Sequence, residues 1–263
     1  MTSFDLNRLQ HETSLQHVEY HETLDSTNKL AAELLPNLMP LCPAIVLATT
    51  QTAGRGRGSN SWWANSGALT FSLILNVDQL NLRPDRLPLV SLATGVAVRQ
   101  CIAPLVPDGV VSIKWPNDVL LNERKVAGIL TEQISVAGLP ALIIGVGVNV
   151  NNSLQGAPDG VQQRATSVFD ATGESIDLTE LLISILNAID QSINELGGRS
   201  RMLLSELNRH SVLNGRTVKL QAGETLTTGL CHGVDEGGAL VLASAPVLRA
   251  AGSAERGLVP QRN

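Results

Sequence analysis

The segment 69–77 constrains the fold of this chain more strongly than any other part of its sequence. Its odd-numbered positions are all apolar: Leu69, Phe71, Leu73, Leu75 and Val77. A period of two is typical of a β-strand that has one face against a core. Because a single strand can neither bury that face nor pair its backbone groups, the chain must build a sheet around it.

Further strands are expected where short apolar or β-branched segments end at turn residues. They are 18–24, 44–50, 110–115, 141–150, and a hairpin within 118–134 that turns at Asn122 and Glu123. Helices are expected at 26–35, 87–105, 178–196 and 201–209, and the apolar residues of 178–196 recur at helical steps of three and four. Residues 1–16 should form a loose arm, and 51–66 and 151–164 should be loops. Beyond residue 214, short strand patterns with glycine-rich turns indicate a small β-barrel.

The composition is that of a folded globular protein. Hydrophobic residues make up 43% of the 263 residues and charged residues 16%, which is enough apolar material for a core. No apolar run approaches about 18 residues and the N-terminus lacks the regions of a signal peptide, so we expect a cytoplasmic protein. A net charge of −5 argues against general nucleic-acid binding. The three cysteines are far apart, which argues against a disulfide framework or a zinc knuckle.

The loop 51–63 has the composition of an anion-binding segment. Three glycines alternate with Arg55 and Arg57. Glycine lets the backbone approach a ligand closely, and arginine donates two parallel hydrogen bonds to a carboxylate or phosphate. The loop lacks the third glycine of the dinucleotide fingerprint and the Gly-Lys-Ser/Thr of a P-loop, so it would hold a phosphate in another way. The alternative is a flexible basic loop like those of RNA-binding RGG tails.

Four other segments are weaker signals when each is taken alone. They are DSTN at 25–28, KWPND at 114–118, RKVAGIL at 124–130 and GVGVNVN at 145–151. Each also has an ordinary structural explanation: a helix cap, a tight turn, an edge lysine that limits aggregation, and the packing of a central strand.

Together, in this order and spacing, the five segments resemble the biotin–protein ligases, over about residues 18–250. The resemblance implies an α+β fold: a mixed β-sheet backed by helices, similar to the class II synthetase-like catalytic domain of biotin–lipoyl ligases, followed by a small SH3-like β-barrel. Residues 1–210 would form the catalytic domain that binds biotin and ATP, and 211–263 the barrel. Because only 24 residues precede Asp25, we expect the monofunctional type without an N-terminal DNA-binding domain.

The resemblance also implies a two-step reaction with ATP and biotin as substrates. The biotin carboxylate attacks the α-phosphate of ATP to give biotinyl-5′-adenylate and diphosphate. A lysine of a biotin carboxyl carrier domain then displaces AMP. Cations would offset the repulsion between the two anionic substrates and stabilise charge that develops at phosphorus.

Roles are assigned to residues by their position in the family pattern. Biotin and its activated carboxyl would be lined by Ser26, Thr27, Asn28, Gln51, Arg55, Gly56, Arg57 and Lys125. ATP would be bound by Arg57, Trp62, Asn117 and Asn149. The catalytic groups would be Lys125, Arg57, Lys114 and Asp118, with Asp118 as a proton acceptor for the incoming lysine. Asn117 and Asp118 are also candidates for holding Mg²⁺ through oxygen atoms.

Two other functions stay open at this point. One is a lipoate or octanoate ligase or transferase of the same architecture, but the Arg-Arg-x-x-Gly-Gly-Gly type of loop is missing from the sequence. The other is a non-catalytic biotin-binding regulator, but both Lys114 and Lys125 are present. The expected partners are the carrier domain, biotin and ATP, without DNA or a membrane; a homodimer paired through a sheet edge stays open.

Overall fold

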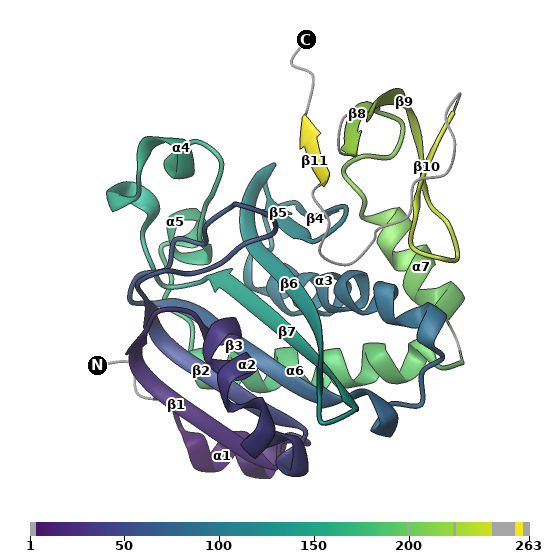
Figure 1. Ribbon diagram of the computed structural model, residues 1–263. Coiled ribbons are helices and arrows are strands. Elements are labelled where there is room, and N and C mark those ends of the chain that lie inside the picture. The colour runs from purple at the N-terminus through teal and green to yellow at the C-terminus, as the bar shows by residue number, and fades with distance from the viewer. Residues whose placement is uncertain (1–3, 199, 223–224, 244–255, 260–263) are drawn as a thin grey trace.

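A seven-stranded mixed sheet forms the centre of the protein. The computed structural model in Figure 1 describes residues 4–198, 200–222, 225–243 and 256–259. The strand order is β1-β2-β3-β7-β6-β5-β4, with β1 parallel to β2 and all other neighbours antiparallel. The strands are β1 (His17–Leu24), β2 (Ala44–Gln51), β3 (Ala68–Asn76), β4 (Val111–Lys114), β5 (Asp118–Leu121), β6 (Arg124–Val136) and β7 (Leu139–Asn149).

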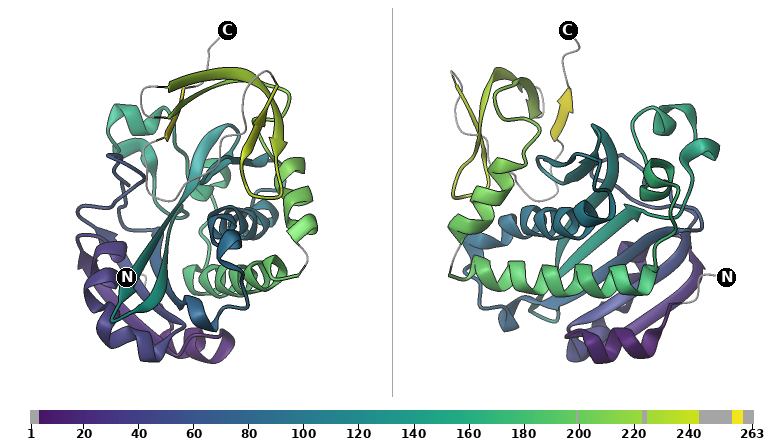
Figure 2. Two further views of the ribbon diagram at one scale, coloured as in Figure 1. Left: turned by 45° about the vertical axis from the view of Figure 1, so that its right-hand side comes forward. Right: turned by 180° about the vertical axis from the view of Figure 1, so that it is seen from behind.

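Helices cover both faces of this sheet, which confirms the expected α+β class. On one face α2 (Thr27–Leu38) packs Ala31 and Leu35 against Val46 and Ile143. On the other face α3 (Val90–Ile102) and α6 (Leu178–Leu196) pack together over the larger core. The rear view in Figure 2 shows α6 lying across the sheet.

Most expected elements are present, with shifted ends. The expected helix 26–35 continues to Leu38 and carries Pro36 inside its last turn. The expected helix 87–105 is α3 extended by 3₁₀ turns at both ends, and the expected loop 151–164 contains two short helical segments. The short helices are α4 (Asp159–Gln162), α5 (Val168–Thr172) and α7 (Ser200–Arg209), and the 3₁₀ turns are Met39–Leu41, Val77–Gln79, Pro84–Leu89, Ala103–Leu105 and Leu154–Gly156.

The helical run Pro84–Leu105 is long and apolar enough to cross a membrane by length and composition alone. However, 56% of its most apolar window is buried inside the protein. This run contains α3, whose side chains belong to the core under the sheet. Its apolar character is therefore explained by burial within the fold.

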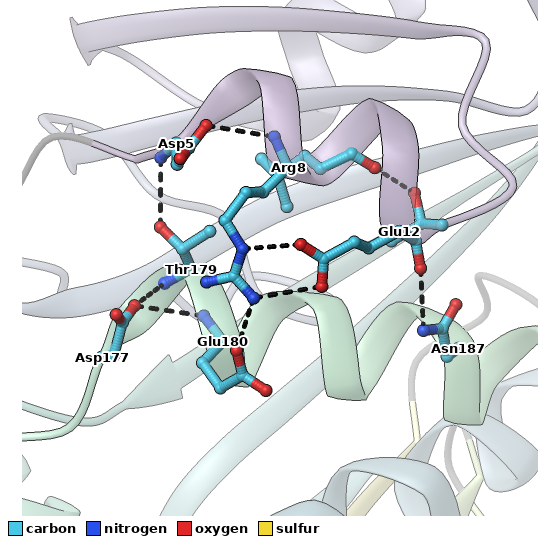
Figure 3. Close-up of polar contacts among 9 residues, drawn as sticks. Asp5, Arg8, Glu12, Asp177, Thr179, Glu180 and Asn187 are labelled. Atoms are coloured by element: carbon cyan, nitrogen blue, oxygen red, sulfur yellow. Dashed lines mark hydrogen bonds and ion pairs between the residues drawn. The ribbon is translucent and has the colours of Figure 1, made fainter.

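The expectation of a loose N-terminal arm is wrong. Residues Leu6–Glu12 form α1, which begins at the cap residue Asp5 and buries Leu9 completely. Figure 3 shows how α1 is attached to α6: Arg8 pairs with Glu180 of α6 at 2.7 Å, and it also pairs with Glu12 of its own helix at 2.6 Å. The apolar residues here are too few to show a helical period, and the contacts that hold α1 come from a segment more than 170 positions away.

A second, smaller sheet follows α7. Its order is β10-β9-β8-β11, from β8 (Thr217–Ala222), β9 (Thr225–Val234), β10 (Leu240–Leu242) and β11 (Arg256–Val259). The first three lie beyond residue 214, where short strands were expected, and the sheet is consistent with the SH3-like region that the resemblance implies. The fourth, β11, pairs antiparallel with β8 and was not expected.

The small sheet is packed closely against the larger part of the protein. The buried Trp115 donates its indole N–H to the carbonyl of Gly238 at 3.0 Å, and Gly238 lies directly against Leu89 and Leu92. Arg216 also pairs with Glu123 at the β5–β6 turn, at 3.0 Å. These contacts fix the small sheet beside the end of β4.

Candidate functional site

One cavity of about 770 Å³ collects every residue proposed for a role in the site. It lies on the α2 face of the sheet, at the N-terminal end of α2. Residues of β6 and β7 that lie beyond this end of the helix line the cavity. Its lining includes Ser26, Thr27, Asn28, Gln51, Arg55, Gly56, Arg57, Trp62, Lys114, Asn117, Asp118, Lys125 and Asn149. Segments as distant in sequence as 26–28 and 149 therefore meet at one place.

Glycines make room for this cavity in the two central strands. A methyl group added at Gly145 would collide with the side-chain oxygen of Asn28, and one at Gly147 would collide with the ring of Trp62. On the neighbouring strand, a methyl group at Gly128 would lie 2.9 Å from Nζ of Lys125. The glycines of the GVGVNVN and RKVAGIL segments are thus needed because the side chains of Asn28, Trp62 and Lys125 lie across the sheet surface.

The start of α2 is held by a residue from β2 instead of by its own cap. Ser26 occupies the cap position, but its hydroxyl makes no capping hydrogen bond, so the ordinary explanation for DSTN does not hold. Gln51 instead accepts hydrogen bonds with its Oε1 from the backbone N–H of Thr27 at 2.7 Å and from its hydroxyl at 3.2 Å. Ser26 and Thr27 are both buried at the cavity wall.

The glycine–arginine loop folds back on itself over the cavity. The backbone N–H of Trp62 donates to Gly54 at 2.8 Å, and that of Gly56 donates to Asn60 at 2.8 Å. Arg55 pairs with Glu132 on β6 at 2.9 Å. The composition of the loop does not indicate this partner, because Glu132 lies 77 positions along the chain and reaches Arg55 from β6.

Lys125 and Asp118 form an ion pair inside the cavity. Nζ of Lys125 lies 2.6 Å from Oδ1 of Asp118 and 5.7 Å from the ring centre of Trp62. A register shift between β5 and β6 at Val119 and Leu120 interrupts the alternation of β6. Lys125 therefore shares a face with Gly128, whereas strict alternation would put them on opposite faces.

The KWPND segment sends its side chains in two directions. Lys114 and Asp118 are direct partners across the β4–β5 hairpin, and both line the cavity. The Asn117 amide donates to the carbonyl of Ile129 at 2.8 Å, which ties the turn to β6. The ring of Trp115 instead packs inward and reaches Gly238 of the small sheet.

Asn149 is buried at the far end of β7. Its amide donates to the carbonyl of Thr166 at 3.1 Å and its oxygen accepts from Asn152 at 3.1 Å. These two contacts use one amide hydrogen and one oxygen lone pair of Asn149.

The cysteines lie outside this cavity. Burial raises the pKa of the Cys101 thiol to about 11 and raises the pKa of the Cys42 and Cys231 thiols as well. A thiol of this kind is a weak nucleophile at neutral pH. The arrangement is consistent with a reaction that needs no covalent enzyme intermediate.

Three polar residues of the site region gave no signal in the sequence. Arg164 and Gln221 line the cavity, from the segment after α4 and from β8. Glu132 contacts two of the cavity residues, Arg55 and Asn28. The alternation of β6 places Glu132 on the face of Gly128 and Leu130, which could have drawn attention to it.

The family model described as "Biotin/lipoate A/B protein ligase family" matches residues 20–149. A biotin–[acetyl-CoA-carboxylase] ligase of Paracoccus denitrificans is 37% identical over 227 residues, which cover 83% of this chain and 90% of that protein. The bifunctional ligase/repressor BirA of Bacillus subtilis is 41% identical over 68% of this chain. The chain spans about half the length of the Bacillus relatives that it matches.

A solved structure of the biotin protein ligase from Aquifex aeolicus in complex with biotin and ATP has the same fold. Its TM-score is 0.76 at 27% sequence identity, with 94% of this chain and 100% of that chain covered. The similarity therefore includes the seven-stranded sheet and its helices as well as much of the smaller sheet.

Proposed function

The chain belongs to the biotin/lipoate A/B protein ligase family, with biotin protein ligases as relatives over most of its length, and we propose that it attaches biotin to a lysine of a biotin carboxyl carrier domain. The reaction consumes ATP, passes through biotinyl-5′-adenylate and releases AMP and diphosphate. The observation that carries the proposal is the meeting of all thirteen candidate residues in one cavity.

In the first step the two substrates are both anions, so the cavity must reduce their repulsion. Arg57, Lys114 and Lys125 supply positive charge from the loop, β4 and β6. Lys125 is suited to contact both the biotin carboxyl and the α-phosphate, because its Nζ lies beside Gly128 and both residues line the cavity. Preorganised cations of this kind stabilise charge that develops in the transition state.

Recognition of biotin is assigned to the neutral polar groups at the start of α2. The hydroxyl of Ser26 and the amide nitrogen of Gln51 can bind the acceptor and donor groups of the ureido ring, since neither is used in the hydrogen bonds that hold α2. Trp62 and Asn149 are assigned to the adenine side of the cavity. Trp62 also covers Gly147 and so shields the adenylate from water.

In the second step the carrier lysine must lose a proton before it attacks the adenylate. Asp118 is assigned as the proton acceptor, because it is the carboxylate nearest to Lys125 in the cavity. The amine then forms the amide bond to the biotin carbonyl while AMP leaves. The ion pair with Lys125 keeps Asp118 positioned until the lysine arrives.

Mg²⁺ is expected to accompany ATP, and the chemistry of the donor set fits it in part. Asp118 and Asn117 offer a carboxylate and an amide oxygen in the cavity. Within the described residues no group of three or more His, Cys, Asp or Glu side chains is arranged for a metal. Mg²⁺ commonly binds through one or two carboxylates plus substrate phosphates, so these two residues would hold it only together with ATP.

A mass-shift assay on a carrier domain tests the proposed function. The carrier is incubated with the protein, ATP and either biotin or lipoate, and its intact mass is measured. We expect the mass of one biotinyl group with biotin and no change with lipoate. A lipoyl shift would support the lipoate ligase alternative, and biotin binding without any shift would support the regulator.

The small sheet should act mainly in the transfer step. Among its described residues Gln221 lines the cavity, whereas the biotin groups lie on α2, β2 and the loop. Gln221→Ala should raise KM for the carrier by about 2–10-fold, the effect of one polar contact, and leave the biotin Kd unchanged. Thr217→Ala, on the same strand, is the matched control. A larger effect on biotin binding than on carrier KM would contradict this assignment.

The remaining expectations stay predictions. They are the division at residues 210 and 211, the cytoplasmic location, the lack of DNA binding and the monofunctional type, while the pairing of two copies through a sheet edge stays open.

A further inference from the structure

We propose that Glu132 is a positioning residue for biotin activation, which fastens the glycine–arginine loop over the biotin site and orients the wall of that site. The inference rests on the proposed function, since it assigns a role within the same cavity. Its carboxylate links Arg55 of the loop, Asn28 of α2 and its own strand, β6. Three separate parts of the site are thereby connected through one side chain.

The contact with Arg55 uses both terminal nitrogens of its guanidinium group. Nη2 of Arg55 donates to Oε1 of Glu132 at 2.9 Å, and Nη1 donates to Oε2 at 3.4 Å. The side chain of Glu132 is 22% exposed and that of Arg55 is 48% exposed, so the pair lies at the edge of the cavity. A two-point arginine–carboxylate contact fixes direction as well as distance.

The contact with Asn28 completes the hydrogen bonding of a buried amide. Nδ2 of Asn28 donates to Oε2 of Glu132 at 2.8 Å and to the carbonyl of Leu130 at 3.2 Å. Its Oδ1 accepts from the hydroxyl of Ser72 at 2.6 Å. Both amide hydrogens are therefore used within the protein. Asn28 cannot donate to biotin while it keeps these bonds, and it acts as a fixed part of the wall.

The same geometry divides the work between the two arginines of the loop. The guanidinium group of Arg55 is occupied by Glu132, so Arg55 holds the loop in place. Arg57 lines the same cavity and is the arginine assigned to the anionic groups of the substrates. An uncompensated carboxylate at Glu132 would repel the biotin carboxylate, and its pairing with Arg55 removes that repulsion. The pair thus closes the loop and keeps the entrance neutral.

Glu132→Gln separates the two contacts, because glutamine still offers an oxygen to Asn28 but carries no charge for Arg55. We expect the biotin Kd and the biotin KM of adenylate formation to rise about tenfold, the loss of one charge-assisted contact. The rate of transfer from preformed adenylate to the carrier should stay within about twofold, because the transfer groups lie on β4 to β6 near Asp118. Trypsin cleavage after Arg57 in the ligand-free protein should become about fivefold faster, since an open loop is cut more easily.

A double-mutant cycle separates positioning from a general structural effect. Arg55→Gln should raise the biotin Kd about as much as Glu132→Gln does, and the double variant should be no worse than either single variant. Glu132→Ala should bind biotin more weakly than Glu132→Gln does, because alanine also removes the hydrogen-bond acceptor for Asn28. Asp85→Asn is the matched control, since it removes an ion pair of the same 2.9 Å length on Pro84–Leu89, outside the cavity.

The possible results distinguish this proposal from the proposed function. If the double variant raised the biotin Kd by the product of the two single effects, Glu132 and Arg55 would act independently. That result would overturn the link between them. So would cleavage after Arg57 that is as slow in Glu132→Gln as in the unchanged protein. If the unchanged protein bound no biotin and formed no adenylate, the proposed function would fail, while the cleavage rates would still decide whether Glu132 holds the loop.

Discussion

Replacing Lys125 with alanine should slow the formation of biotinyl-adenylate by about 30–1000-fold. The ammonium group of Lys125 lies beside Gly128, near the Trp62 ring and next to the carboxylate of Asp118. Loss of a cation that strengthens its contacts in the transition state costs about 2–4 kcal/mol. The variant also leaves the carboxylate of Asp118 without its neighbouring cation, which adds repulsion toward the phosphates. Diphosphate release in the presence of biotin and ATP measures the effect.

Lys219→Ala is the matched control for this variant. Lys219 is another of the four lysines, lies on β8 of the small sheet and does not line the cavity. Its replacement should leave diphosphate release unchanged. Release by Lys125→Ala within about threefold of the unchanged protein would show that this lysine does not stabilise the reacting groups.

Replacing Gly145 with alanine should reduce biotin affinity by about 10–100-fold. The new methyl group would collide with the side-chain oxygen of Asn28, which is buried and held by Ser72, Leu130 and Glu132. Because Asn28 cannot move without losing these bonds, α2 and the wall of the site must shift. Overpacking of this kind costs about 1–3 kcal/mol. Calorimetric titration with biotin, together with a thermal melt, measures binding and stability separately.

Gly156→Ala provides the comparison for this second variant. A methyl group there would have no atom within 4 Å, and its backbone conformation is open to alanine. It should bind biotin as the unchanged protein does. Unchanged biotin affinity in a folded Gly145→Ala protein would mean that the position of Asn28 does not matter for the site.

The elements with a strong period could be predicted from the sequence because their pattern is a local property. The alternation from Leu69 predicted β3, the continuous apolar run predicted β7, and the steps of three and four predicted α6 with its observed ends, Leu178–Leu196. The turn at Asn122 and Glu123 was also predicted correctly, and both residues have positive φ angles. In each case the side chains that face the core are set by positions close together in the chain.

The elements that the sequence missed depend on distant partners. The α1 helix has a buried Leu9 but no clear apolar stripe, and it is held by α6 through Arg8 and Asp5. The β11 strand is short and is defined by its pairing with β8. A segment that gains most of its stability from contacts far along the chain carries little local signal.

The order of residues along the chain sets which residue types are available for the site and how far apart they occur. Glycines beside arginines, a lysine at the end of one strand and another near the start of a later strand are visible in the chain order. Which of these groups meet depends on how the elements pack in the folded protein. The register shift between β5 and β6 turned Lys125 onto the cavity face, and the packing of the loop and of α2 on the sheet brought Arg55 and Asn28 to Glu132. Local spacing fixes the direction of a side chain only within a regular element, whereas contacts between elements are set by packing over the whole fold.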